Sequence, residues 1–383
     1  GDLVEIGGAD LALSPREASQ LLSWLDPSLD QAYRDILVAR TEGWPAGLWL
    51  AGLAVAQADD AGSFVAGFRG TDRYVSEYLL GEVLESFSGE ERNFMIETSI
   101  LSRLTGDLCD AVTGRSGGAE TLAQLERSNA FVIPLDRDDR WYRYHHLFGD
   151  LVAAELHRTR PDEEQLLHRR AFEWLRADGE VADAIRHGLA AGEVDAAADL
   201  LAENNFPMVN SGRAETARAL VAMFPPEIVA DHQPFAVAAA GINAMTGRPE
   251  AAQRWLAAAE KATHEGPRPD GMANTTSSIG LVRGSLAPDG VDAALADGRM
   301  ALELEPRGGE PWTLAALLVG RSLVMRGDVE ESTEFFEDVA RGEWTNMRAY
   351  ALAEISLGQL GRGDAERALA TANVASTLMH EAG

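Results

Sequence analysis

The sequence predicts a mainly α-helical protein, in which a helical domain and a winged helix are followed by a tetratricopeptide-like α-solenoid. Three observations carry this prediction. Apolar residues recur at helical spacing through the first 130 residues. One pair of β-prone runs follows, at 131–135 and 141–144, around a charged turn. From about residue 163 onward the sequence carries no strand signal, and helical patterns alternate with glycines.

The first elements are a short strand and a capped helix. Residues 3–6 are β-prone and Gly7 ends them. Ser14 precedes a proline and is followed three residues later by Glu17, which is the pattern of a helix capping box. Further helices are expected at 29–42, 47–56, 73–87 and 89–100, and shorter ones at 107–112 and 121–128.

The β-prone runs and the helices around them predict a winged helix. Three helices precede the hairpin and another, at 147–156, follows it. An unrelated hairpin on a helical domain is the alternative. Residues 76–160 hold 9 Arg and 15 acidic residues, a balance of −6. This charge opposes phosphate backbones, so the predicted winged helix is expected to contact protein and to make no direct contact with DNA.

The second half contains a repeat. Gly247, Gly327 and Gly363 mark it, and the spacing from Gly327 to Gly363 is 36 residues. Small or apolar residues stand seven before, five after and twelve after each glycine: Ala240, Gly320 and Ser356; Ala252, Ser332 and Ala368; Ala259, Val339 and Ala375. The gap of 80 residues after Gly247 leaves room for one more unit near Gly290. Such periods are tetratricopeptide-like. An ordinary helical bundle is the alternative, and residues 264–278 are expected to be a loop.

Composition limits the chemistry. The chain has 383 residues and a net charge of −28, which disfavours nucleic-acid and anionic-membrane surfaces. Its longest apolar run, at 44–56, is too short to span a bilayer. The single cysteine, Cys109, fits a reducing cytoplasm. The single lysine, Lys261, has no glycine loop before it, so the chain has no P-loop and is not expected to be an enzyme.

We predict no catalytic and no metal-binding residues. Cys109 lies between two acids and is expected to be a buried structural residue. The Gly-x-Ser-x-Gly string at 114–118 follows a helix instead of a strand, so a plain loop is expected. His145 and His146 are adjacent, and their side chains would diverge on a helix. Trp255, Phe335, Phe336 and Trp344 can line a groove of the repeats or belong to their core.

Two segments are unusual. Residues 43–48 place a proline and two glycines between helices, and residues 141–148 place two histidines where the predicted wing meets a helix. A helix N-terminus with an imidazole donor is a good phosphate contact. A helix cap combined with core packing is the alternative.

Residues 42–48 and 141–148 resemble the MalT-like family of large LuxR-type, ATP-dependent transcriptional regulators, which are STAND-class signalling NTPases. The resemblance also rests on residues 98–101, 108–114 and 125–129, and beyond about residue 200 only on the repeat pattern. It implies that residues 1–25 are the C-terminal edge of an NTPase core and 26–75 a helical domain. It further implies a winged helix at 76–162 and a helical-repeat sensor arm at 163–383.

The resemblance also implies nucleotide contacts. Gly43, Trp44 and Pro45 are similar to a Gly-x-Pro motif whose proline packs on adenine. Residues 144–148 are similar to a Met-His-Asp motif, in which the histidine contacts the ADP β-phosphate and holds the resting state. His145 takes that role here, with a second histidine in place of the aspartate. No cofactor is expected in this segment alone, while the full-length protein would use ATP and ADP with magnesium.

The expected function is therefore regulation of transcription by signal transduction in the cytoplasm. An inducer, a small molecule or a protein, would bind the sensor arm and favour an ATP-bound form that self-associates. The other partners would be the protein's own NTPase core and LuxR DNA-binding domain, both absent from this segment. A different class stays open, in which the same cassette is a protein-binding scaffold in a bacterial Ser/Thr kinase or another signalling protein.

Overall fold

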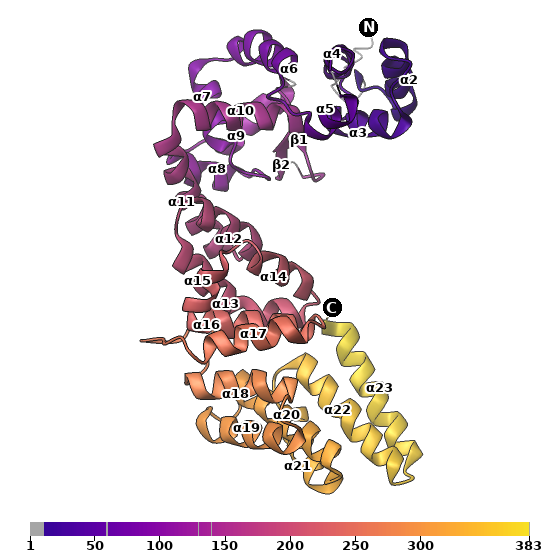
Figure 1. The fold of residues 1–383 in the computed structure, drawn as a ribbon, viewed down its shortest axis with the longest axis vertical. Coiled ribbons are helices and arrows are strands. Elements are labelled where there is room, and N and C mark those ends of the chain that lie inside the picture. Colours follow the sequence, from indigo (N-terminus) through magenta and orange to yellow (C-terminus); the bar gives the residue numbers. More distant parts are fainter. Residues whose placement is uncertain (1–10, 59, 129, 139, 383) are drawn as a thin grey trace. The chain divides into compact units, whose positions relative to one another are not determined.

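The computed structural model describes residues 11–58, 60–128, 130–138 and 140–382. The predicted strand at 3–6, the Gly7 that ends it and the first ten residues of the predicted core edge at 1–25 lie outside them. The chain forms two compact units, one reaching Asp178 and including Ala190–Gly192, the other Gly179–Leu189 with Glu193–Gly383 (Figure 1). Almost all described elements are helices, so the mainly α prediction is confirmed. Among the described residues, none of the helices combines the length and apolarity needed to cross a membrane.

The first unit begins with a small helical bundle. Its helices are α2 (Pro15–Leu25), α3 (Gln31–Thr41), α4 (Pro45–Val55) and α5 (Ala61–Gly67). The predicted capping box is present, because Ser14 Oγ accepts from the Glu17 N–H and the Glu17 carboxylate accepts from the Ser14 N–H. Helix α2 packs on both α3 and α4, burying Leu22 and Leu48 completely.

The winged helix follows. Its elements are α6 (Arg73–Tyr78), the π-helical turn η1 (Leu79–Val83), the 3₁₀ turn η2 (Leu84–Ser86), α7 (Gly89–Thr98), α8 (Gly106–Thr113), α9 (Gly118–Arg127), β1 (Val132–Pro134), β2 (Tyr142–Tyr144) and α10 (His146–Thr159). The prediction of a single helix at 73–87 was wrong in detail. This segment is divided into α6, η1 and η2, and Gly81, a poor helix former, lies in the π-helical turn η1.

The hairpin is short and well anchored. Val132 pairs with Tyr144 in antiparallel register, and Leu104 adds a bridge through two backbone hydrogen bonds to Tyr142, of 2.7 and 2.9 Å. Tyr142 and Tyr144 are both buried, as expected if alternate hairpin residues face the core. The Tyr144 hydroxyl lies 2.7 Å from Thr98 Oγ1, which ties the hairpin to α7.

Helix α11 (Pro161–Asp178) packs with the first unit. It contacts α8, and the Arg170 side chain donates to the Val112 carbonyl at 3.0 Å. The predicted domain boundaries at 25/26, 75/76 and 162/163 stay predictions, whereas packing places the change of unit at Asp178.

The second unit is a stack of helical hairpins. Its helices are α12 (Val181–Ala190), α13 (Val194–Asn210), α14 (Ala214–Val221), α15 (Pro226–Asp231), α16 (Gln233–Met245), α17 (Pro249–Ala259), α18 (Thr275–Leu286), α19 (Val291–Leu304), α20 (Glu310–Arg326), α21 (Val329–Ala340), α22 (Thr345–Gly361) and α23 (Ala365–Ala382). Four antiparallel pairs run from α16 to α23 (Figure 1). The tetratricopeptide-like solenoid is therefore confirmed.

The repeat pattern has a structural cause. Gly247, Gly327 and Gly363 each follow the first helix of a pair with φ between +73° and +99°, a conformation that favours glycine. The small residues on either side are buried in the contact between the paired helices. At Gly320, a Cβ atom would lie 2.8 Å from the Phe336 ring. The extra unit expected near Gly290 is the pair α18 and α19.

Two expectations about this half need adjustment. The loop predicted at 264–278 ends earlier, because the Asn274 side chain accepts from the Ser277 N–H and α18 begins at Thr275. Trp255 and Phe336 belong to the core, whereas Trp344 is 39% exposed. Most of these aromatic residues therefore belong to the core of the repeats, which was the alternative to a groove lining.

Candidate functional site

The predicted site residues come together within the first unit. Gly43, Trp44 and Pro45 form the link between α3 and α4, and His145 immediately precedes α10. Gly43 has a φ of +77°, and a Cβ atom there would lie 2.5 Å from the Leu13 carbonyl oxygen. Pro45 occupies the first position of α4, where its missing N–H costs nothing. The backbone of this link therefore requires a glycine at position 43 and accommodates a proline at position 45, whether or not a nucleotide binds.

His145 is a buried connector between the hairpin and α3. The residue is 6% exposed, and its Nε2 lies 3.0 Å from the Thr41 carbonyl oxygen. Because a carbonyl oxygen can only accept, Nε2 carries the hydrogen, and in the neutral imidazole Nδ1 is then a bare acceptor. Nδ1 is buried without a hydrogen-bond partner. Burial lowers the pKa of His145, against the opposing effects of Glu42 and the Thr41 carbonyl.

Trp44 packs between the helical bundle and the hairpin. Its ring lies 5.2 Å from Phe131 and 6.0 Å from His145, both edge-on, and 5.8 Å from Tyr78. Gly47 one turn later lies under this ring, and a Cβ atom there would approach it to 2.3 Å. The aromatic cluster therefore fixes the position of the α3–α4 link against the hairpin.

Glu42 is the residue that sequence reasoning missed. Its carboxylate accepts two hydrogen bonds from Arg143, of 2.6 and 2.9 Å, and one of 3.2 Å from the His146 N–H. His146 Nδ1 lies 2.8 Å from the same carboxylate. The N-terminus of α10 is therefore occupied by an internal anion, where the sequence suggested a place for phosphate.

The charge of Glu42 is strongly stabilised. Burial alone raises its pKa, but the Arg143 hydrogen bonds, the charge that His145 carries when protonated at low pH and the His146 N–H outweigh burial and lower the pKa to about 2. Glu42 and Arg143 are 101 residues apart, so the sequence marks Glu42 only as the first residue of the segment 42–48 that resembles the family. The alternative prediction for this segment, a helix cap combined with core packing, describes the geometry well, and the residue that caps α10 is Glu42.

The remaining candidates have structural surroundings. Cys109 is buried, and burial followed by the nearby Asp110 charge raises the pKa of its thiol. Residues 114–117 form the plain loop before α9. Within the described ranges, no cluster of three or more His, Cys, Asp and Glu side chains could hold a metal ion.

Comparison with known proteins supports the resemblance stated above. The family described as the MalT winged helix domain matches residues 80–164. The serine/threonine-protein kinase PknK of Mycobacterium tuberculosis is 30% identical over 249 residues, which are 65% of this chain and 22% of the kinase. The HTH-type transcriptional regulator MalT of Klebsiella pneumoniae is 30% identical over 226 residues, 58% of this chain and 25% of that protein.

The chain thus spans about a quarter of the length of these curated relatives. A STAND protein with a tetratricopeptide repeat sensor from Pyrococcus horikoshii aligns with 97% of this chain and 60% of its own, at a TM-score of 0.48 and 15% identity. Residues 80–164 match the MalT winged helix domain family, and the chain is similar to MalT regulators and to the kinase PknK.

Proposed function

We propose that this MalT-like chain is the regulatory and sensor segment of an ATP-dependent, LuxR-family transcriptional regulator. Inducer binding on the helical-repeat arm would be coupled to an ADP/ATP switch at the α3–α4 link. The observation that carries the proposal is the position of His145, which joins the hairpin and α10 to the Thr41 carbonyl beside Gly43, Trp44 and Pro45. A contact of this kind gives a switch two arrangements, held and released.

The imidazole of His145 fits a phosphate contact under one condition. Its Nδ1 has no partner but is buried, so a phosphate oxygen would reach it only after a local opening, and Nδ1 must then carry a hydrogen to donate. ADP binding would therefore require His145 to take up a proton or to release the Thr41 carbonyl. The α10 N-terminus is not available for the phosphate, because Glu42 already neutralises it. Gly43, Trp44 and Pro45 would contact the adenine.

Nucleotide hydrolysis is assigned to the NTPase core of the full-length protein, which would bind ATP or ADP with magnesium. This segment lacks the lysine-bearing phosphate loop, so we propose that it is not an enzyme and contributes part of the nucleotide contact. Calorimetry with ATP and with ADP on this chain is expected to give no tight binding. A strong binding heat at low micromolar nucleotide would contradict this part of the proposal.

The other partners follow from the same layout. The segment would contact its own NTPase core and LuxR domain, bind a small-molecule or protein inducer on the arm, and self-associate when activated. It would act in the cytoplasm without contacting DNA or membrane directly.

The switch is tested in the full-length regulator. His145→Ala removes the imidazole that holds the resting state, so transcription of a reporter without inducer should rise. His157→Ala is the matched control, because His157 lies on α10 with 78% of its side chain exposed. Unchanged basal transcription in the His145 variant, with normal protein level, would refute the switch role.

A second candidate function is a protein-binding scaffold in a signalling kinase. The similarity to PknK over 65% of this chain favours it. The full sequence of the gene that encodes the chain distinguishes the two functions. A LuxR domain encoded downstream supports the regulator, and a kinase domain encoded upstream supports the scaffold.

A further inference from the structure

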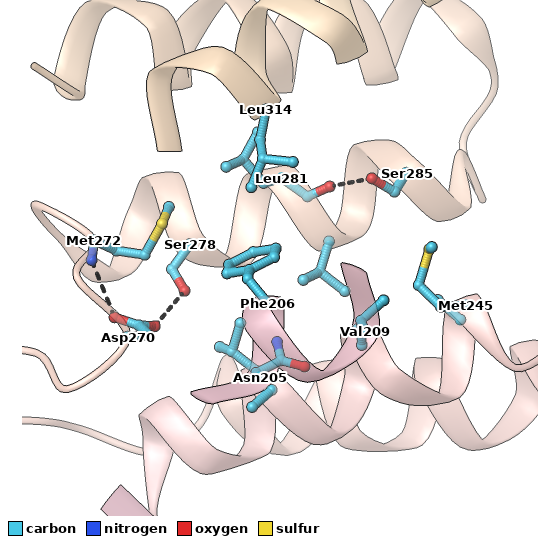
Figure 2. Close-up of a pocket in the computed structure, with 15 residues that line it drawn as sticks. Asn205, Phe206, Val209, Met245, Asp270, Met272, Ser278, Leu281, Ser285 and Leu314 are labelled. Carbon is cyan, nitrogen blue, oxygen red and sulfur yellow. Dashed lines mark hydrogen bonds between the residues drawn. The ribbon is translucent and has the colours of Figure 1, made fainter. Parts of the chain in front are cut away.

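The second unit contains a cavity between α13, α16 and α18, with a volume of about 170 Å³ (Figure 2). Most of its wall is apolar, with contributions from Val209, Val237 and Leu281. Met245 lines the cavity as well and is 69% exposed, so the cavity reaches the surface on that side. A space of this size, with an apolar wall and an opening, can take up a small molecule.

The two polar atoms of the Asn205 side chain lie in different surroundings. Asn205 lines the cavity and is 7% exposed, and its Oδ1 is enclosed by the protein without a hydrogen-bond partner. Its Nδ2 adjoins the cavity, because a Cβ atom at the cavity-lining Gly241 would lie 3.8 Å from Nδ2 and 3.9 Å from Val282 Cγ2. Figure 2 shows the amide nitrogen on the side of Phe206. The atom of Asn205 that borders the open space in front of Gly241 is therefore the donor, Nδ2.

This donor has no acceptor. Among the described residues, Asn205 Nδ2 makes no hydrogen bond, whereas Nδ2 of the neighbouring Asn204 donates to the Leu200 carbonyl at 2.9 Å. An amide nitrogen carries two hydrogens, and a largely buried donor that stays unpaired is unfavourable. A molecule that brings an acceptor into the space in front of Gly241 therefore gains a hydrogen bond there.

The other polar side chains that line the cavity offer no free hydrogen. Asp270 accepts from Arg268 in an ion pair that is almost fully buried, so its carboxylate can only accept. The Ser278 hydroxyl donates to this carboxylate at 3.2 Å, a contact drawn in Figure 2. The Ser285 hydroxyl donates to a backbone carbonyl of its own helix at 2.7 Å. Among the described side chains of the wall, Asn205 is thus the one with a donor left for a ligand.

We propose that this cavity binds a small, uncharged and mainly apolar molecule, about the size of one substituted ring, whose carbonyl oxygen accepts from Asn205 Nδ2. An apolar cavity of about 150 Å³ is sufficient to hold benzene. A ligand carboxylate is disfavoured, because one neutral donor in an apolar wall does not offset the loss of its hydration. That this molecule acts as the inducer rests on the proposed function, whereas its binding does not.

Binding is tested on the whole chain with acetophenone and ethylbenzene as probes. The two have nearly the same shape, but only acetophenone carries a carbonyl oxygen. Methionines labelled with ¹³C at the methyl group report the location, since Met245 and Met272 line the cavity and Met95 is buried in the other unit. Both probes should shift the Met245 and Met272 signals and leave Met95 unchanged. Acetophenone should bind about fivefold more tightly than ethylbenzene, as expected for one hydrogen bond.

Two variants make the assignment specific. Asn205→Leu keeps the bulk of the side chain and removes the donor, so acetophenone should then bind no more tightly than ethylbenzene. Gly241→Leu should abolish the shifts from both probes, because its side chain would fill the space in front of Asn205 Nδ2. Gly358→Leu is the control, since Gly358 lies on α22 with similar free space at 3.6 Å, and it should leave binding intact. If Gly241→Leu does not fold, the ratio of the two affinities in Asn205→Leu decides.

Three results would each overturn the proposal. They are the absence of shifts at Met245 and Met272 up to millimolar acetophenone, equal or tighter binding of ethylbenzene by the wild-type chain, and an undiminished preference for acetophenone in Asn205→Leu. Because this assay measures binding to the chain without nucleotide or transcription, its failure leaves the His145 switch untouched. Failure of the reporter experiment likewise leaves the cavity assignment standing.

Discussion

Replacing Glu42 with glutamine should loosen the junction between the helical bundle and the hairpin. The substitution keeps the size of the side chain and one acceptor oxygen but removes the charge that pairs with Arg143 and the α10 N-terminus. Charge-assisted hydrogen bonds of this kind contribute about 1.5–3 kcal/mol. We therefore expect the free energy of opening this junction to fall by about 2–3 kcal/mol.

The pKa of Glu42 gives an independent magnitude. A carboxyl group that titrates at about 2 in the folded protein, against an ordinary value of 4.5, contributes at most about 3 kcal/mol at neutral pH. This is an upper limit, because 18% of the side chain is exposed and solvent screens the pair. The folded pKa is lowered, so the stabilisation is complete above pH 4.5 and is lost as the pH falls from 4.5 towards 2.

Hydrogen exchange measures the effect locally. At pH 7, amides of β2 and the first turn of α10 should exchange about 30- to 150-fold faster in Glu42→Gln, at about 1.4 kcal/mol per tenfold. Glu77→Gln removes a pair whose side chains are 62% and 82% exposed, and should change exchange less than threefold. In urea unfolding, the difference between wild type and Glu42→Gln should shrink between pH 4.5 and 2. Exchange within twofold of wild type for Glu42→Gln would refute this account of the junction.

Three further outcomes are expected. Gly43→Ala should destabilise the chain in urea unfolding by about 1–3 kcal/mol. The loss should exceed that of Gly363→Ala, because Gly363 shares the positive φ but has no neighbour like the Leu13 carbonyl. Equal losses would show that the close contact between Gly43 and the Leu13 carbonyl is unimportant. Tyr144→Phe should cost about 1 kcal/mol in the same assay through the lost hydrogen bond, and no loss would show that bond to be unimportant. Cys109 should resist iodoacetamide in the native chain and react in urea, and native labelling would contradict its burial.

The features that the sequence predicts well are decided by local contacts. Ser14 and Glu17 are three residues apart, and both halves of their capping box lie within one helical turn. Gly327 and Gly363 end helices because the next turn needs a positive φ. Such rules act over a few residues, so they can be read from one sequence without knowing the tertiary contacts.

The junction around His145 could be predicted only in part. The link residues Gly43 and Pro45 are visible because their types restrict the backbone. The pairing of Glu42 with Arg143 is not visible, since any one of the 61 acidic residues has many possible basic partners. The sequence therefore indicated a helix end suited to an anion, and the structure supplies that anion from the chain itself.

The cavity in the second unit illustrates a different limit. At Gly280, Gly284 and Gly298 a Cβ atom would lie 2.6–2.8 Å from a neighbouring side chain, so these glycines allow helices to touch. At Gly241 the nearest atom is 3.8 Å away, and the same residue type borders a void. Both kinds lie in helices of the repeat stack, and only the packing of the neighbouring helix distinguishes them. Small residues in a helical repeat thus predict where helices pair, whereas a site within the repeat depends on the places where that pairing is incomplete.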